Sequence, residues 1–97
     1  MKINEMKKRD NNNVYNQMHR MAELTIMNVL SGKLIRAKRL LDVGEKLFAN
    51  GNYQTRNAVT NVFLYDVSSV LTLRHCDVLT LFPPSLQQEY IKQINAF

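Results

Sequence analysis

The chain of 97 residues is 45% hydrophobic, 22% charged and 8% aromatic, which excludes a disordered chain and allows one hydrophobic core. Its formal net charge of +5 favours anionic partners, but a charge of this size also simply keeps a small domain in solution. Because Cys76 is the single cysteine, an internal disulfide is excluded, and because no apolar run reaches about 18 residues, a membrane-spanning helix is excluded as well. The polar N-terminus does not resemble a secretory signal. We therefore expect a cytoplasmic protein.

The N-terminal segment, residues 1–12, is polar and carries a run of basic residues. This composition offers too little apolar surface to offset the entropy lost when a chain becomes ordered. We therefore expect a mobile tail over residues 1–12 and a single helical domain over residues 13–97.

The first predicted helix covers residues 14–31, because apolar side chains between Val14 and Val29 recur at the spacing of one helical face. Asn13 precedes it and can accept a hydrogen bond from a backbone amide of the first turn. Ser31-Gly32 can end the helix, since glycine tolerates the left-handed conformation of a C-terminal cap.

The second and third predicted helices cover residues 33–49 and 53–73, separated by a turn at Asn50-Gly51. Residues 53–73 are rich in β-branched side chains, which favour strands. Their apolar side chains nevertheless recur at helical spacing, and a strand of about 20 residues would far exceed the usual length. We therefore predict a central helix whose apolar face comprises Val59, Val62, Phe63, Val70 and Leu73.

The last predicted helix covers residues 84–96 and follows a connector over residues 74–82. Pro83-Pro84 marks its start, because proline is tolerated in a first turn, and Ser85 with Gln88 has the spacing of a capping box. Four helices with short connections and no strand pattern indicate an all-α, single-domain, mostly antiparallel bundle.

Several motifs together carry a resemblance to a known family: GKLIRA at residues 32–37, EKLF at 45–48, NAVTNVFLY at 57–65, and FPPSL at 82–86 followed by Glu89-Tyr90. Over roughly residues 14–95 they resemble a small helical domain family of unknown function that is frequent in Bacteroidetes-type bacteria. The resemblance implies an all-helical, single-domain, cytoplasmic bacterial protein and carries no known activity. The chain departs from the family pattern at Gly44, where alanine is favoured, and at Asp66, where serine is favoured.

Catalysis or metal binding would have to use His19, His75, Cys76 and Asp77. A Cys-His dyad needs its two side chains within about 3.5 Å, whereas neighbouring residues usually point apart. The histidines and the thiol match no metal-ligand spacing. We therefore expect no enzymatic activity, no metal and no cofactor.

Asp66 is the first candidate site residue, because uniform helical spacing places its carboxylate within the apolar face of the central helix. An unpaired buried carboxylate is costly. We expect it to pair with an arginine or a tyrosine hydroxyl of a neighbouring helix, or else to contact a ligand or partner.

The second candidate site is a set of apolar residues that point away from the main helical stripes: Leu24, Met27, Ile35 and Val43. Such residues must either be enclosed or form an association surface. The leading interpretation is a protein-interaction module that self-associates through this set, with a symmetric dimer as the simplest assembly.

The alternative interpretation is a nucleic-acid-associated regulatory protein, based on the basic residues Lys7, Lys8, Arg9, Arg36, Arg39 and Lys46. Phosphate binding requires a continuous positive stripe. Asp42 and Glu45 interrupt this stripe, and on a helix they lie close enough to the lysines to pair with them. We therefore expect a paired, solvated face, with a protein partner favoured over nucleic acid and no membrane partner.

Overall fold

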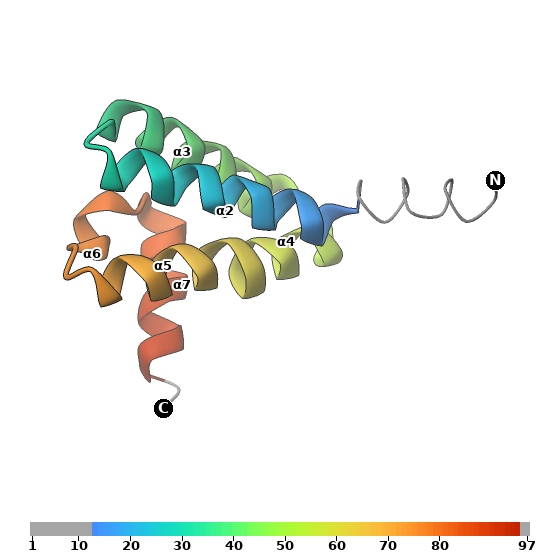
Figure 1. Ribbon diagram of the computed structural model, residues 1–97. Helices are drawn as coiled ribbons and strands as arrows, with labels where there is room; N and C mark the ends of the chain where they lie inside the picture. The colour runs from blue at the N-terminus through green and yellow to red at the C-terminus, as the bar shows by residue number, and fades with distance from the viewer. Residues whose placement is uncertain (1–12, 96–97) are drawn as a thin grey trace, which may run out of the picture.

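The computed structural model describes residues 13–95, and every regular element in this range is helical, which confirms the all-α prediction. The elements are α2 (Val14–Leu30), α3 (Leu34–Asn50), α4 (Tyr53–Ala58), the π-helix η1 (Val59–Leu64), α5 (Tyr65–Leu73), α6 (Val78–Leu81) and α7 (Pro84–Asn95). The elements α4, η1 and α5 follow one another without a break and form the predicted central helix. Figure 1 shows α2, α3 and this helix side by side, with α7 crossing beneath them.

The ends of α2 are set by the residues that the sequence indicated. The Asn13 side chain accepts a hydrogen bond from the backbone amide of Asn16 at 2.9 Å, which confirms it as the N-cap. At the other end Gly32 has φ of 79°, and its amide and that of Lys33 donate to carbonyls of the last turn. Glycine adopts this left-handed conformation without a steric penalty, so the predicted stop is also confirmed.

The π-helix η1 changes which side chains of the central helix are buried. Its fully buried side chains include Val59, Phe63, Val67 and Leu71, which lie four residues apart. In a π-helix each backbone hydrogen bond spans five residues, so a turn holds more residues than in an α-helix. Val59 and Phe63 are therefore confirmed as core residues, but beyond η1 the uniform spacing assumed from the sequence gave the wrong register, and Leu73, predicted in the core, is 80% exposed.

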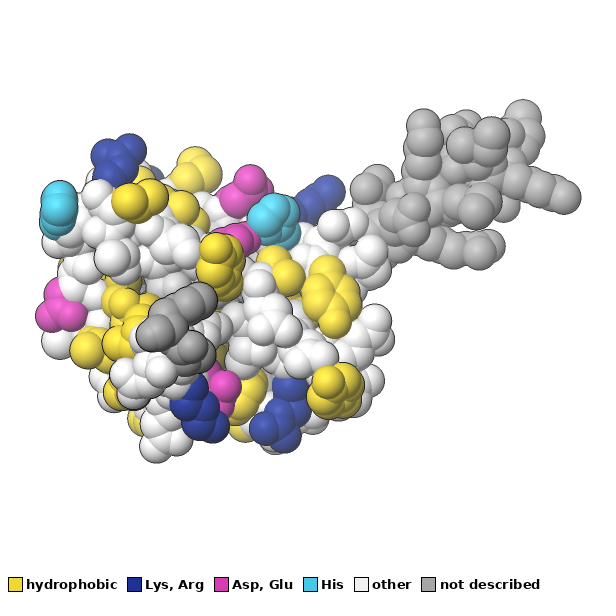
Figure 2. Space-filling view, turned by 90° about the horizontal axis from the view of Figure 1, so that it is seen from below, with side chains coloured by type: hydrophobic (Ala, Val, Ile, Leu, Met, Phe, Trp, Pro, Cys, Tyr) yellow, Lys and Arg dark blue, Asp and Glu magenta, His cyan; other side chains and the backbone are white. Residues whose placement is uncertain are grey.

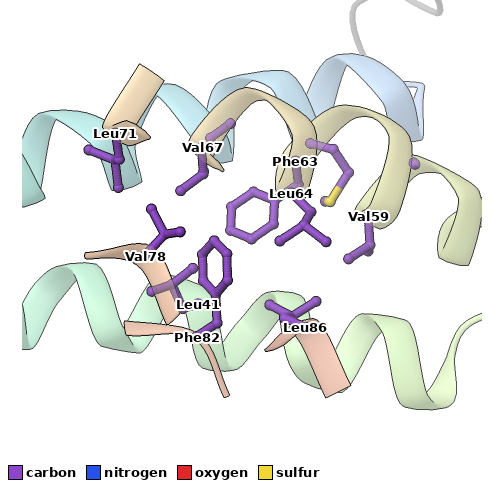
Figure 3. Close-up of a cluster of buried hydrophobic side chains, with 12 residues drawn as sticks. Leu41, Val59, Phe63, Leu64, Val67, Leu71, Val78, Phe82 and Leu86 are labelled. Atoms are coloured by element: carbon purple, nitrogen blue, oxygen red, sulfur yellow. The ribbon is translucent and has the colours of Figure 1, made fainter. Parts of the chain in front are cut away.

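The core lies between the α2–α3 hairpin, the central helix and the segment from α6 to α7. Figure 3 shows the side chains of Phe63 and Phe82 in the middle of this cluster. Further buried members are Met18, Ala22, Leu41, Ala58, Val59, Leu64, Val67, Leu71, Val78 and Leu86. The buried hydroxyl of Thr25 donates to the Met21 carbonyl at 2.8 Å, so this polar group is satisfied within its own helix.

The start of α7 differs from the predicted capping box. Because α7 begins at Pro84, Ser85 lies within the first turn and its backbone amide needs an acceptor. The carboxylate of Glu45 on α3 supplies it, accepting from the amides of Ser85 and Leu86 at 3.1 Å. Glu45 is therefore half-buried against α7, and the prediction that it lies on a solvated face is wrong.

The segment predicted as a connector contains the short helix α6 and begins with a left-handed residue. His75 has φ of 61°, and its amide donates to the Thr72 carbonyl at 3.0 Å while that of Cys76 donates to Leu71 at 2.9 Å. These are the two hydrogen bonds of a Schellman cap, in which His75 occupies the position that usually holds glycine.

Replacement of His75 by glycine should therefore raise the free energy of unfolding by about 0.5 to 1 kcal/mol, because it removes the left-handed strain of a residue with a Cβ atom. Urea titration followed by circular dichroism measures this change. The opposite substitution Gly32→Ala, at the equivalent position of α2, should lower it by about 1 kcal/mol. A loss of stability in His75→Gly would mean that the imidazole makes a contact of its own.

Candidate interaction surfaces

Asp66 lies at the edge of the core and pairs with a residue of α2. Its Oδ2 contacts Nδ1 of His19, and the two side chains are 25% and 63% exposed. The partner is thus a histidine instead of the expected arginine or tyrosine. A contact this open to solvent contributes little to stability, and its main effect is to satisfy a carboxylate beside the core. The pair joins α2 to α5 and leaves Asp66 half-buried.

The residues considered for catalysis are divided between two places. His19 lies on α2, where it contacts Asp66 of α5. His75, Cys76 and Asp77 lie in the segment between α5 and α6. The Cys76 thiol is 4.0 Å from the Arg74 carbonyl, and among residues 13–95 no hydrogen bond joins it to a histidine. Within the same range no group of three or more histidine, cysteine, aspartate or glutamate side chains could hold a metal ion.

The predicted self-association set is exposed on the α2–α3 hairpin. Leu24 and Met27 on α2 are 51% and 63% exposed, and Ile35 and Val43 on α3 are 72% and 45% exposed. Leu30 and Leu34, on either side of the turn, are also exposed, at 43% and 46%. The hairpin thus buries one face in the core and presents large apolar side chains on its outer side.

The basic residues of α3 are exposed, as expected, but they are less paired than the sequence indicated. Arg36, Arg39 and Lys46 are exposed, and within the part of the chain that the structure describes none of them forms an ion pair with a carboxylate. Asp42 pairs with neither neighbouring lysine, and Glu45 binds the start of α7. The expected charge pairing along α3 is therefore wrong. The remaining basic candidates, Lys7, Lys8 and Arg9, lie outside the described residues, as does the predicted tail.

A groove without charged side chains lies between the central helix and α7. It has a volume of about 560 Å³ and is lined by Asn61, Tyr65, Ser68, Ser69, Thr72, Leu73, Tyr90, Gln93 and Ile94. Figure 2 views the molecule from below Figure 1, the side towards which α7 extends, and shows separate hydrophobic side chains among polar ones. The amide of Gln93 donates to the Thr60 carbonyl in η1 at 2.9 Å, which fixes α7 against the π-helix beside the groove. The groove can therefore take an uncharged, largely apolar surface.

Sequence reasoning missed this groove because its walls come from helices that are far apart in the chain. Tyr65 and Leu73 are 57% and 80% exposed, and the uniform helical spacing had placed Leu73 in the core.

The role of Glu45 as the acceptor for α7 was also missed, because Glu45 and α7 are far apart in the chain, although the sequence held one signal of it. Pro83, the residue before α7, has no side chain that can cap a helix, so the first-turn amides needed an acceptor from elsewhere.

The fold and these surfaces define a small all-α domain with exposed apolar and basic faces, and none of its described helices is long and apolar enough to cross a membrane. The chain belongs to the family described as Domain of unknown function (DUF7674), whose model matches residues 1–96. This agrees with the resemblance to a family of unknown function, and the match also includes the N-terminal segment. Neither a curated protein nor a solved structure matches the chain.

Proposed function

We propose that this protein is a non-enzymatic interaction module that self-associates in the reducing cytoplasm. The observation that carries the proposal is the groove between the central helix and α7, which is open, largely apolar and lined by no charged residue. Exposed apolar surface of this kind is typical of interaction sites in small proteins. The lone Cys76, half-buried, suits a compartment in which thiols stay reduced.

The groove suits self-association better than the outer side of the α2–α3 hairpin does. In a symmetric dimer the same patch of both copies meets itself. Pairing through Ile35 would bring the exposed, unpaired Arg36 and Arg39 of each copy towards those of the other, and like charges across an interface oppose binding. The groove holds no charge, so two copies with a net charge of +5 can meet there without this local penalty.

The helix α7 also adds exposed apolar side chains to this face. α7 forms one wall of the groove and carries Ile91 and Ile94, which are 40% and 49% exposed. A two-fold axis beside the groove would place α7 of each copy against α5 of the other. Tyr65 and Leu73 would then lose their exposure to water, which is the favourable contribution to such an association.

The test is the oligomeric state of two matched variants, Leu73→Glu in the groove and Met27→Glu on the hairpin. Both side chains are mostly exposed, at 80% and 63%, so either change should leave the melting curve close to that of the parent. Sedimentation equilibrium at tens of micromolar should show a dimer for the parent and for Met27→Glu. Leu73→Glu should weaken the dimer by about tenfold or more, because a charge would be buried without a partner.

Two other outcomes would contradict this proposal. A parent chain that sediments as a monomer at these concentrations contradicts self-association itself. Loss of the dimer in Met27→Glu, with Leu73→Glu unaffected, would move the interface to the predicted set Leu24, Met27, Ile35 and Val43 and contradict its assignment to the groove.

A further inference from the structure

The closed end of the α2–α3 hairpin has a one-sided charge distribution. Residues 24–41 contain no aspartate or glutamate but include Lys33, Arg36, Lys38 and Arg39, all of them exposed. Among residues 13–95 the acidic side chains in contact with a basic one are Asp66, with His19, and Glu89, with Lys92, so no described carboxylate contacts these cations. The first turn of α3 adds to the positive potential, since it has no acidic residue and no side-chain cap.

Large apolar side chains lie among these cations. Ile35 is 72% exposed and, around the axis of α3, lies between Lys38 and Arg39. Met27 at the end of α2 is 63% exposed. A hollow of about 430 Å³ opens beside the turn and is lined in part by Ile35, Arg36 and Arg39. The surface thus combines positive charge, exposed aliphatic groups and a depression that can hold a side chain.

This combination distinguishes among anionic partners. A phosphate backbone would pair with the cations but would leave Ile35 and Met27 in water, and residues 24–41 contain no aromatic side chain on which a base could stack. A bilayer is flat on the scale of the hairpin and would not fill the hollow beside Arg36. A second copy of the chain would bring cation against cation. A helix with acidic residues beside an aliphatic stripe complements all three features.

We infer that the closed end of the α2–α3 hairpin binds an acidic amphipathic helix of another protein. Carboxylates of that helix pair with Arg36 and Arg39, for which the guanidinium group offers two parallel donors. Its aliphatic stripe covers Ile35 and Met27, and one of its side chains enters the hollow. This site is separate from the groove, so a dimer formed at α7 leaves it accessible.

The probe is a synthetic amphipathic peptide of about 18 residues with leucine and glutamate at helical spacings of three and four. Its affinity for the full chain is measured by fluorescence anisotropy. The double variant Arg36→Glu/Arg39→Glu should weaken binding by about tenfold or more, because two charge pairs become repulsive. The control Arg20→Glu/Lys46→Glu changes the net charge by the same amount at exposed positions, with Lys46 towards the opposite end of α3, and should weaken binding by less than about threefold.

Two further arms test the apolar part and the location of the site. Ile35→Ser should weaken binding of the peptide, and a peptide of the same composition in scrambled order should bind more weakly to the parent chain. Leu73→Glu, which disrupts the groove, should bind the peptide like the parent. The inference and the proposed self-association therefore fail independently of each other.

Three results would overturn the inference. One is equal weakening by the two double variants, which would show that net charge alone attracts the peptide. Another is equal binding of the ordered and scrambled peptides. The last is tighter binding of a DNA duplex or of phosphatidylserine vesicles than of the peptide, with that binding lost in Arg36→Glu/Arg39→Glu, which would assign the surface to nucleic acid or lipid.

Discussion

Replacement of Glu45 by alanine should lower the free energy of unfolding by about 2 to 3 kcal/mol, the range for removing hydrogen bonds to a charged group. The Glu45 carboxylate accepts from the backbone amides of Ser85 and Leu86, each at 3.1 Å, and both hydrogen bonds are partly buried. Its negative charge also lies at the positive end of α7. Without it the first-turn amides lose their acceptor, and α7 loses its polar connection to α3.

Thermal unfolding by circular dichroism should show the effect as a decrease in Tm of about 10 °C for a domain of this size. Glu45→Gln keeps the length of the side chain and one good acceptor, so its loss should be smaller. Asp42→Ala, one turn earlier on the same helix, changes an exposed carboxylate without an ion pair and should have little effect. Equal losses in Glu45→Ala and Asp42→Ala would contradict the capping role.

Replacement of Gly44 by alanine should also destabilise the protein, although alanine is the better helix former. A Cβ atom at Gly44 would lie 2.8 Å from Cε2 and 3.2 Å from Cδ2 of Phe63, whose ring is fully buried. Overpacking of a core costs about 1 to 3 kcal/mol, against a gain of about 1 kcal/mol in helix propensity. We expect a net loss of about 1 to 2 kcal/mol. The alanine that the family resemblance favours here would require this ring to shift.

A double-mutant cycle with Phe63→Leu identifies the cause of this loss. Leucine has no ring to meet the new methyl group, so Gly44→Ala should be neutral or stabilising in that background. Urea titrations of the four proteins give the coupling free energy. The same loss in both backgrounds would show that the contact between α3 and η1 is not what requires glycine at this position.

Local sequence determined the number, type and approximate bounds of the main helices. Asn13 and Gly32 act on backbone groups within one turn, so their capping roles could be inferred without knowledge of any other part of the chain. The central helix over residues 53–73 was likewise predictable, because its apolar periodicity outweighed its β-branched composition.

The exposed apolar side chains of the α2–α3 hairpin could also be predicted from the sequence. Leu24, Met27, Ile35 and Val43 lie off the apolar stripes of their own helices, and a helix that packs through one stripe leaves such residues outside. The free cations beside them were not predicted. Glu45 binds the start of α7 instead of a lysine of its own helix, because α7 begins beside it. The position of α7 cannot be inferred from the apolar periodicity of α3.

Only the tertiary structure decided the register of the central helix, the partner of Asp66, the cap of α7 and the groove. The π-helical turn at η1 adds residues to a turn and shifts every apolar position after it, so Leu73 lies outside the core. His19 meets Asp66, and Glu45 meets Ser85, across long stretches of sequence. Propensity and periodicity act within a few residues along one helix, whereas these contacts depend on the packing of helices that the chain brings together from distant positions.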